Sequence, residues 1–162
     1  MSASELVRSK ILTADSLRRK LHLWRFKQQK IVFTNGCFDI LHLGHVELLS
    51  KAAALGNILI VGLNSDSSVR NLKGINRPLQ GEDTRASVLA SLFYVNAVML
   101  FDEETPIELI KTISPDVLVK GGDYTIENIV GADWVLQQGG KVEIIPLLEG
   151  YSSSNVVNRL IS

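Results

Sequence analysis

Apolar and mixed segments follow one another along the chain, and this order predicts strands and helices in turn. Several short runs are apolar at every position, which is typical of strands that are covered on both faces, as in a parallel sheet. Other segments place apolar residues three and four positions apart, as amphipathic helices do. Five strands are predicted, at residues 31–34, 58–63, 97–101, 116–119 and 142–145.

The helices are predicted between and around these strands. Thr13 or Asp15 is suited to cap a first helix. Residues 1–12 before it are interpreted as a tail of uncertain order. The helix over 82–92 is expected to present one apolar face, formed by Ala86, Leu89, Ala90 and Phe93. The other helices are expected at 44–55, from Ser65, after Pro106, at 134–138 and at 152–161.

This regular alternation predicts an α/β fold with right-handed crossovers and helices on both faces of the sheet. We therefore expect a Rossmann-like, doubly wound parallel sheet of five strands. Residues 1–29 are predicted to form an N-terminal tail and helix, and residues 30–162 the domain itself. Ligands of such sheets bind beyond the carboxyl ends of the strands. Polar or glycine-rich segments follow several of the predicted strands, at 35–45, 64–66, 121–124 and 150–154.

Composition narrows the possible partners and compartment. The 162 residues include 17 basic and 17 acidic side chains, so the basic excess of a nucleic-acid surface is missing. Cys37 is the only cysteine, which suits a reducing compartment. No apolar run approaches the roughly 20 residues of a membrane span, and no signal peptide is visible. We expect a cytoplasmic protein that binds neither nucleic acid nor membrane.

Two of the three histidines, His42 and His45, lie between the first long strand and the next helix. A helix N-terminus offers free backbone N–H groups and a partial positive charge, and so forms an anion site. Two imidazoles there add further donors for a phosphate. Zinc is the main alternative, but neither a third suitable histidine nor a Cys-x-x-Cys pair is present. The glycine patterns of P-loops and dinucleotide folds are also missing from this segment.

The pattern His-x-Gly-His after a Phe-Asp pair resembles the nucleotidyltransferase superfamily that includes the cytidylyltransferases. A longer set of motifs resembles the D-glycero-β-D-manno-heptose 1-phosphate adenylyltransferases, which often form the second half of a bifunctional heptose kinase/adenylyltransferase. The resemblance covers about residues 28–161. The motifs are Phe-Thr-Asn-Gly-Cys-Phe-Asp-Ile-Leu-His from Phe33, Val-Gly-Leu-Asn-Ser-Asp from Val61, Arg77-Pro78, Val-Lys-Gly-Gly-Asp-Tyr from Val119, and Glu-Gly-Tyr-Ser from Glu149.

The resemblance implies transfer of AMP from ATP to the sugar 1-phosphate, with release of pyrophosphate, for lipopolysaccharide or another surface glycan. It implies Mg²⁺ bound through the ATP phosphates, with no protein residue assigned to the metal. A homodimer or larger homo-oligomer is expected. The kinase half is not recognisable in this sequence, so a separate heptose kinase is expected to supply the substrate.

The resemblance also implies roles for individual residues. His42, His45 and Lys73 are expected to be catalytic. Asp39, Asp66, Lys73 and Lys120 are expected to bind the sugar phosphate. The nucleotide is expected to contact Asn35, Gly36, Cys37, Phe38, His42, His45, Gly121, Asp123, Gly150, Tyr151, Ser152, Ser153 and Ser154.

Several of these residues have a plain structural alternative. Asp39 could equally fix the turn that contains it. Arg85 is either a phosphate contact or, the interpretation we favour, a buried salt-bridge partner. Lys73 could be a solvated loop lysine, and Lys120 a strand-end lysine that extends to water. Ser152, Ser153 and Ser154 suit a helix N-terminus as well as a phosphate.

Two other functions remain open from the sequence. One is a CTP-dependent cytidylyltransferase for glycerol 3-phosphate or a similar small phosphate. The arginine that those enzymes carry before their Gly-x-Ser segment is missing here, where the segment runs from Pro146 to Gly150. The other is a nucleotide-binding module without turnover, which the intact pair of histidines speaks against.

Overall fold

The structure is a computed structural model that describes residues 1–146. Within that range the chain forms one sheet whose strands are all parallel, in the order β1-β4-β3-β2-β5-β6. The predicted parallel α/β fold is thus confirmed, with six strands among the described residues where five were predicted. The strands are β1 (Ile11–Leu12), β2 (Ile31–Gly36), β3 (Ile58–Asn64), β4 (Ala97–Phe101), β5 (Val117–Gly121) and β6 (Lys141–Ile145).

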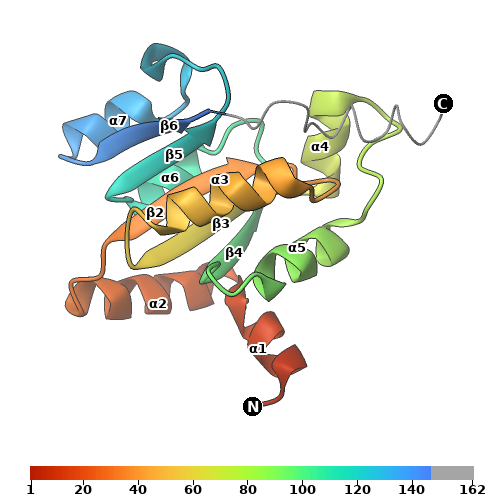
Figure 1. The fold of residues 1–162 in the computed structure, drawn as a ribbon, viewed down its shortest axis with the longest axis horizontal. Helices are drawn as coiled ribbons and strands as arrows, with labels where there is room; N and C mark the ends of the chain where they lie inside the picture. Colours follow the sequence, from red (N-terminus) through yellow and green to blue (C-terminus); the bar gives the residue numbers. More distant parts are fainter. Residues whose placement is uncertain (147–162) are drawn as a thin grey trace.

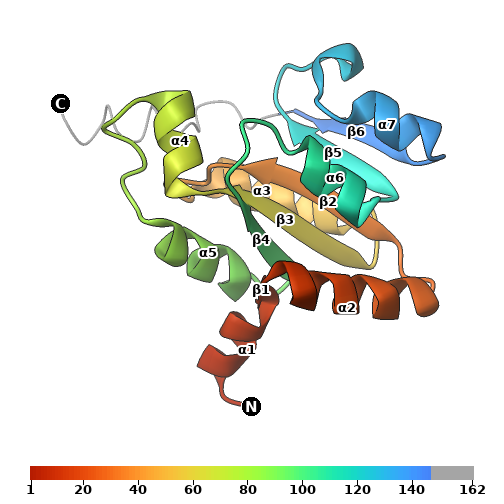
Figure 2. The ribbon, with the colours of Figure 1, turned by 180° about the vertical axis from the view of Figure 1, so that it is seen from behind.

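Helices cover both faces of this sheet, as Figures 1 and 2 show from opposite sides. One face is packed by α3 and α5, with α1 at its margin, and the other by α2, α6 and α7. A short helix, α4, follows β3 at the edge where the strands end. The helices are α1 (Ala3–Lys10), α2 (Ala14–Phe26), α3 (Leu43–Ala53), α4 (Asp66–Lys73), α5 (Glu82–Ser91), α6 (Ile107–Ile113) and α7 (Ala132–Gln137), with a 3-10 turn at Ile126–Asn128.

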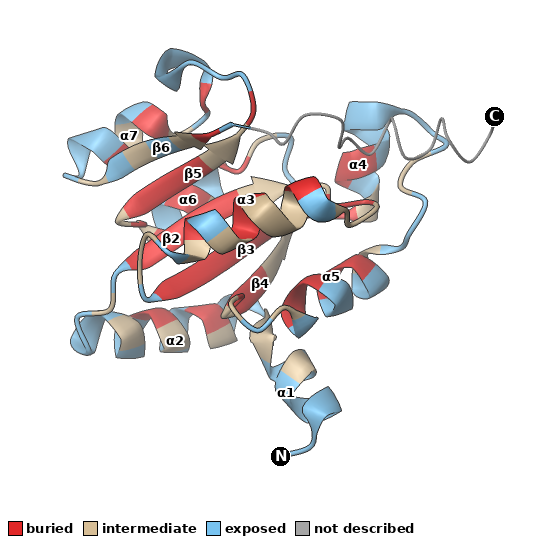
Figure 3. Ribbon diagram, viewed as in Figure 1, coloured by how far each residue is buried: buried red, intermediate tan, exposed pale blue. Residues whose placement is uncertain are grey.

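The strand order reverses at β2, and this reversal fixes where a ligand can bind. From β2 the chain builds outward through β3 and β4, and then returns to place β5 on the other side of β2. Loops that leave β2 and β5 therefore diverge to opposite sides and leave a crevice between the carboxyl ends of the strands. The central strands are almost fully buried, as their colour in Figure 3 shows, so this edge rests on a rigid core.

The N-terminal residues are more ordered than the sequence predicted. In place of a tail of uncertain order, α1 begins at a capping box in which Ser2 and Glu5 bond each other's backbone N–H groups. Strand β1 then pairs with β4, with Ile11 beside Val98. Thr13 caps α2, as predicted, by accepting a bond from the N–H of Ser16.

One predicted core residue is exposed. Phe93 was placed on the apolar face of the helix over 82–92, but its exposed fraction is 89%. Helix α5 ends at Ser91 because Leu92 adopts an extended backbone, which turns the chain away from the helical face. Phe93 instead packs edge-on against Tyr94, with 5.0 Å between ring centroids.

None of the helices in residues 1–146 is long and apolar enough to cross a membrane. The predicted helix over 152–161 and the segment from Glu149 to Ser154 lie outside the described residues.

Candidate active site

The turn between β2 and α3 brings the two histidines together. Strand β2 runs to Gly36, and Phe38 then takes a left-handed backbone conformation, with φ of 44°, that reverses the chain. His42 is the N-cap of α3, without a capping bond from its side chain, and His45 lies in the first turn. Their rings stack with 3.8 Å between centroids, and the ring of Phe38 lies 5.1 Å from that of His45.

Burial favours the neutral form of both imidazoles. Burial lowers the pKa of His45 to about 4, and its neighbours His42 and Lys73 add to the effect because each disfavours a second positive charge beside it. Burial also lowers the pKa of His42. The Nδ1 atoms of both rings are buried and have no hydrogen-bond partner among the described residues. Near neutral pH the pair therefore offers N–H donors to an anion without bringing a full charge of its own.

A pocket of about 280 Å³ opens beside His45 at the carboxyl edge of the sheet. Its lining comes from three parts of the chain that lie far apart in sequence: the end of β2 with the turn and helix α3 that follow it, the end of α4, and the end of β5 with the turn after it. The structure thus brings together eight of the twelve predicted site residues that lie within the described part of the chain, and His42 stacks on one of them. The lining residues are Asn35, Gly36, Cys37, Phe38, His45, Leu48, Lys73, Lys120, Gly121 and Tyr124.

Two lysines give this pocket its positive charge. Lys73 is the last residue of α4 and is exposed. The Nζ atom of Lys120 lies 3.4 Å from Oδ1 of Asn35 and 5.6 Å from the centroid of the Tyr124 ring. Burial lowers the pKa of Lys120, which means that its ammonium group is incompletely solvated. An anion in the pocket would supply a counter-charge to this lysine.

Leu48 and Tyr124 line the pocket but were not predicted as site residues. Leu48 looked like an ordinary core position of a helix. Tyr124 carried a signal, because it belongs to the Lys-Gly-Gly-Asp-Tyr motif that follows β5. Its ring is about half exposed and faces the Lys120 ammonium, so it is available to pack against a ligand.

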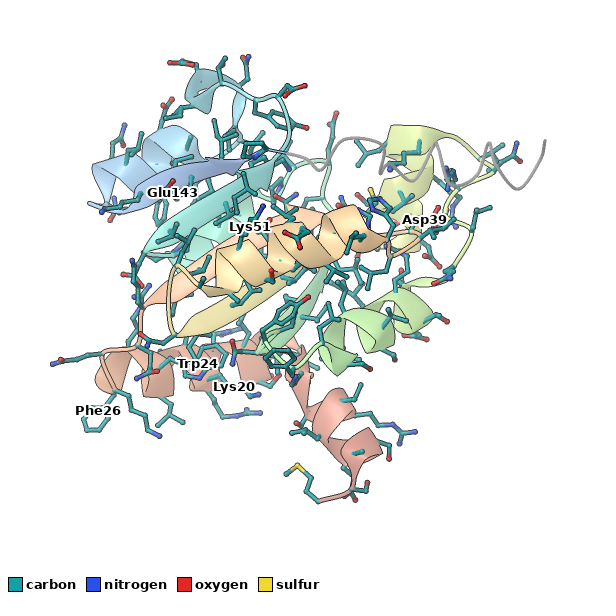
Figure 4. All side chains as sticks on the ribbon, in the orientation of Figure 1. Lys20, Trp24, Phe26, Asp39, Lys51 and Glu143 are labelled. Carbon is teal, nitrogen blue, oxygen red and sulfur yellow. The ribbon has the colours of Figure 1, made fainter. Side chains whose placement is uncertain are left out.

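The carboxylate of Asp39 bonds other residues of the chain and does not line the pocket. Its carboxylate accepts hydrogen bonds from Nη1 of Arg77 at 2.5 Å and from the backbone N–H groups of Leu79 and Gln80 at 2.8 and 3.1 Å. Figure 4 shows it at the amino-terminal end of α3, on the side of α4 and α5. These bonds favour the structural alternative for Asp39, and its contact with substrate stays a prediction.

Arg85 is the buried salt-bridge partner that the sequence analysis favoured. Only 1% of the residue is exposed. Its guanidinium donates to Oδ1 of Asp66 at 2.8 Å and to three backbone carbonyls, those of Cys37, Asn64 and Gln80. Asp66, predicted to bind substrate, therefore faces Arg85 and lies outside the lining of the histidine pocket.

The remaining predicted residues are placed as follows. Cys37 lines the pocket as a free thiol, and burial raises its pKa, which disfavours the reactive thiolate. Asp123 is exposed and does not line the pocket. Gly150, Tyr151, Ser152, Ser153 and Ser154 lie outside the described residues.

Another hollow on the described surface is less polar than the histidine pocket. It is larger, at about 390 Å³, and lies between α2, β4 and α6, where apolar residues such as Leu17, Met99 and Leu109 form most of its wall. Among residues 1–146 no group of three or more histidine, cysteine, aspartate or glutamate side chains is arranged to hold a metal ion. The histidine pocket is suited to an anionic ligand such as a phosphate chain.

The family model for cytidylyltransferase-like proteins matches residues 33–159, which include the whole histidine turn and the end of β5. The chain belongs to the cytidylyltransferase-like family. The predicted nucleotidyltransferase activity is confirmed at this level, and the stacked histidines belong to the matched segment.

Several curated relatives have about half of their aligned residues in common with the chain. It is 53% identical over 153 residues to the bifunctional protein HldE of Syntrophotalea carbinolica, covering 94% of this chain and 31% of the relative. The identity to the bifunctional protein HldE of Caulobacter vibrioides is 55%, over 94% of this chain and 32% of the relative. The chain thus spans about a third of the length of these relatives.

Solved structures share the fold. A lipopolysaccharide core biosynthesis protein from Thermoplasma volcanium aligns with a TM-score of 0.61 and 28% identity, over 76% of this chain and 99% of the other. The pantoate-beta-alanine ligase of Francisella tularensis aligns with a TM-score of 0.64 over 91% of this chain and 72% of the other. At 19% identity, that second likeness concerns the fold alone.

Proposed function

We propose that this chain transfers AMP from ATP to D-glycero-β-D-manno-heptose 1-phosphate and releases pyrophosphate. The observation that carries the proposal is the pocket itself, where His45, with His42 stacked on it, and two lysines meet at the switch point of the sheet. Such a pocket suits a reaction in which negative charge on phosphate is redistributed. The sugar is inferred from the motifs around Lys120 and Glu149 and from the similarity to HldE proteins.

The chemistry is a single in-line displacement. A phosphate oxygen of the sugar 1-phosphate attacks the α-phosphorus of ATP, and the bond from that phosphorus to the bridging oxygen of the β-phosphate breaks. The electron pair leaves with pyrophosphate, so no covalent intermediate with the protein is needed. Catalysis then consists of positioning the two phosphates and stabilising the charge that develops between them.

The residues of the pocket divide this work. His42 and His45 donate hydrogen bonds to the triphosphate, and their neutral form costs little to bury in the pocket. Lys73 lines the same pocket as His45 and balances the charge of the departing pyrophosphate. Lys120, between Asn35 and Tyr124, is placed to hold the sugar phosphate and to contact the neighbouring phosphate of ATP. Mg²⁺ would enter bound to the ATP phosphates and would add positive charge beside them.

Further features belong to the same proposal and remain predictions. They are a cytoplasmic location, a homo-oligomer, and supply of the sugar 1-phosphate by a heptose kinase. Use of the product in a surface glycan is supported by the likeness to the lipopolysaccharide core biosynthesis protein. A cytidylyltransferase is the second candidate, because the family model carries that description.

The proposal is tested by incubating the protein with Mg²⁺, heptose 1-phosphate and ATP, CTP, GTP or UTP in turn, and measuring pyrophosphate. We expect release with ATP and formation of an ADP-sugar that mass spectrometry detects. Glycerol 3-phosphate serves as the alternative acceptor in a parallel series. Release only with CTP would establish the second candidate, and nucleotide binding without release in any mixture would indicate a module without turnover.

A further inference from the structure

The segment that carries Lys73 is tied down at both ends by the same buried side chain. It begins with Asp66, the first residue of α4, and runs through Lys73 and the following loop to Gln80. The Arg85 guanidinium bonds Oδ1 of Asp66 at 2.8 Å and, through Nε, the carbonyl oxygen of Gln80 at 2.9 Å. Lys73 lies between these two anchors, so Arg85 limits where its backbone can be.

The same guanidinium also bonds the histidine turn. Its Nη1 atom lies 2.6 Å from the carbonyl oxygen of Cys37 and 2.8 Å from that of Asn64, at the ends of β2 and β3. Cys37 immediately precedes Phe38, whose left-handed backbone reverses the chain toward His42 and His45. One planar group therefore contacts both the turn that presents the histidines and the segment that presents Lys73.

Asp39 also connects the histidine turn, in which it lies, to the end of the Lys73 segment. Its carboxylate accepts from the N–H of Gln80, whose carbonyl Arg85 bonds, so the backbone of this residue is held on both sides. It also bonds the N–H of Leu79 and the guanidinium of Arg77. Asp39 and Arg85 are each 1% exposed, so solvent weakens these bonds little.

We propose that Arg85 and Asp39 are positioning residues that fix the Lys73 segment relative to the histidine turn, and that the phosphate-binding geometry depends on this clamp. Neither residue lines the pocket. A lysine at position 85 would keep the charge but not the planar fork that reaches four oxygens in different directions. A displacement of about 1 Å between reacting groups can cost about 100-fold in rate.

The first test measures kcat/KM in a double-mutant cycle, and in this respect the inference rests on the proposed function. The variants are R85K, K73A and the two combined, with R70K as the matched control, because Arg70 is an exposed arginine on α4. We expect R85K to lower kcat/KM by about 10- to 100-fold. In the K73A background the same change should cost much less, because the group that it displaces is gone. If the loss of kcat/KM in the double variant equals the product of the losses in R85K and K73A, the proposal is overturned.

A second readout needs no substrate and separates this inference from the proposed function. Hydrogen exchange of the free protein is followed in two peptides, one covering residues 36–42 and one covering 74–81. R85K, or D39N should R85K fail to fold, should accelerate exchange in both peptides together, while R70K leaves both at the wild-type rate. Unchanged exchange in either peptide would overturn the clamp, whatever nucleotide the enzyme uses.

Discussion

At the scale of single residues, two kinds of side chain serve the pocket. The histidines supply hydrogen-bond donors and the lysines supply positive charge. The imidazoles of His42 and His45 supply donors in a buried place, where the charged form is disfavoured. The full charges come from Lys73, which is exposed, and from Lys120, which is buried more deeply. A bound triphosphate would thus receive positive charge from the two lysines and hydrogen bonds from the two imidazoles.

This division predicts a severe effect of removing His45. H45A deletes a donor on the transferring phosphate, and such donors contribute about 100- to 1,000-fold to kcat. We expect a loss of that size in pyrophosphate release, with an unchanged circular dichroism spectrum. H22A, which alters an exposed histidine on α2, is the control and should behave as wild type. Near-normal turnover of H45A would refute the role assigned here.

The low pKa of His45 also predicts how stability varies with pH. The folded state holds the pKa at about 4, and the ordinary value is 6.5, so the unfolded chain binds more protons between these limits. Stability is therefore full above pH 6.5 and falls as the pH drops toward 4. From pH 7 to pH 5 this single group should cost about 2 kcal/mol of the free energy of unfolding.

Urea unfolding at pH 7 and pH 5 measures this effect. The free energy of unfolding of H45Q should fall less between the two pH values than that of the wild-type protein. H22Q, at the exposed histidine, should retain the full wild-type decrease. Equal decreases for wild type and H45Q would mean that His45 titrates alike in the folded and unfolded states.

The same scale shows what a sequence can and cannot predict about the site. His42 and His45 were recognisable because their spacing and their place before a helix are local properties. The partners of Asp39 lie 38 to 41 residues away, and those of Arg85 extend to 48 residues away. Such contacts depend on which loops the fold brings together, so the sequence left both residues with two alternatives.

At the scale of elements, helix α3 connects the core to the site, because it starts at the histidines and ends on the buried face of the sheet. Leu49 is fully buried in its middle, whereas Leu43 at its start is 45% exposed. L49A should lower the free energy of unfolding by about 2–5 kcal/mol, since it leaves a cavity in the core. L43A makes the same change at an exposed position of the same helix and should cost much less.

Urea denaturation of the two variants checks this contrast. Equal losses for L49A and L43A would contradict the packing of α3 against the sheet.

The elements that the sequence missed were those with weak patterns. Strand β1 has only two residues, too few to show a pattern, and it exists because β4 offers an edge with which to pair. Phe93 continued the helical spacing, but nothing local marked the end of α5 before it.

At the scale of the whole molecule, the pocket exists because the sheet reverses its strand order at β2. Alternating patterns predicted that several loops would meet at one edge, but the order of the strands required the structure. Lys120 reaches Asn35 only because β5 pairs with β2, across 85 residues of sequence. A ligand in the pocket therefore bridges the two halves of the sheet, and its binding energy is added to the stability of the whole fold.

This bridging predicts a thermal shift that depends on Lys120. At a nucleotide concentration of 100 times Kd the folded state gains about 2.7 kcal/mol. For a chain of this size that gain raises Tm by roughly 5–10 °C. ATP with Mg²⁺ should give a larger shift than CTP at equal concentration. K120M should reduce the shift, because it removes a cation beside the bound phosphates while keeping the length of the side chain.

K141M is the matched control, since Lys141 is an exposed lysine on the edge strand β6. Each variant is compared with its own Tm without nucleotide, so that a change in intrinsic stability does not enter the shift. A wild-type shift in K120M would remove Lys120 from the binding site and leave Lys73 as the cation that holds the ligand. The same shift in K141M and the wild-type protein, with a smaller one in K120M, would locate the nucleotide or its phosphates at the crevice between β2 and β5, because Lys120, unlike Lys141, lines the pocket there.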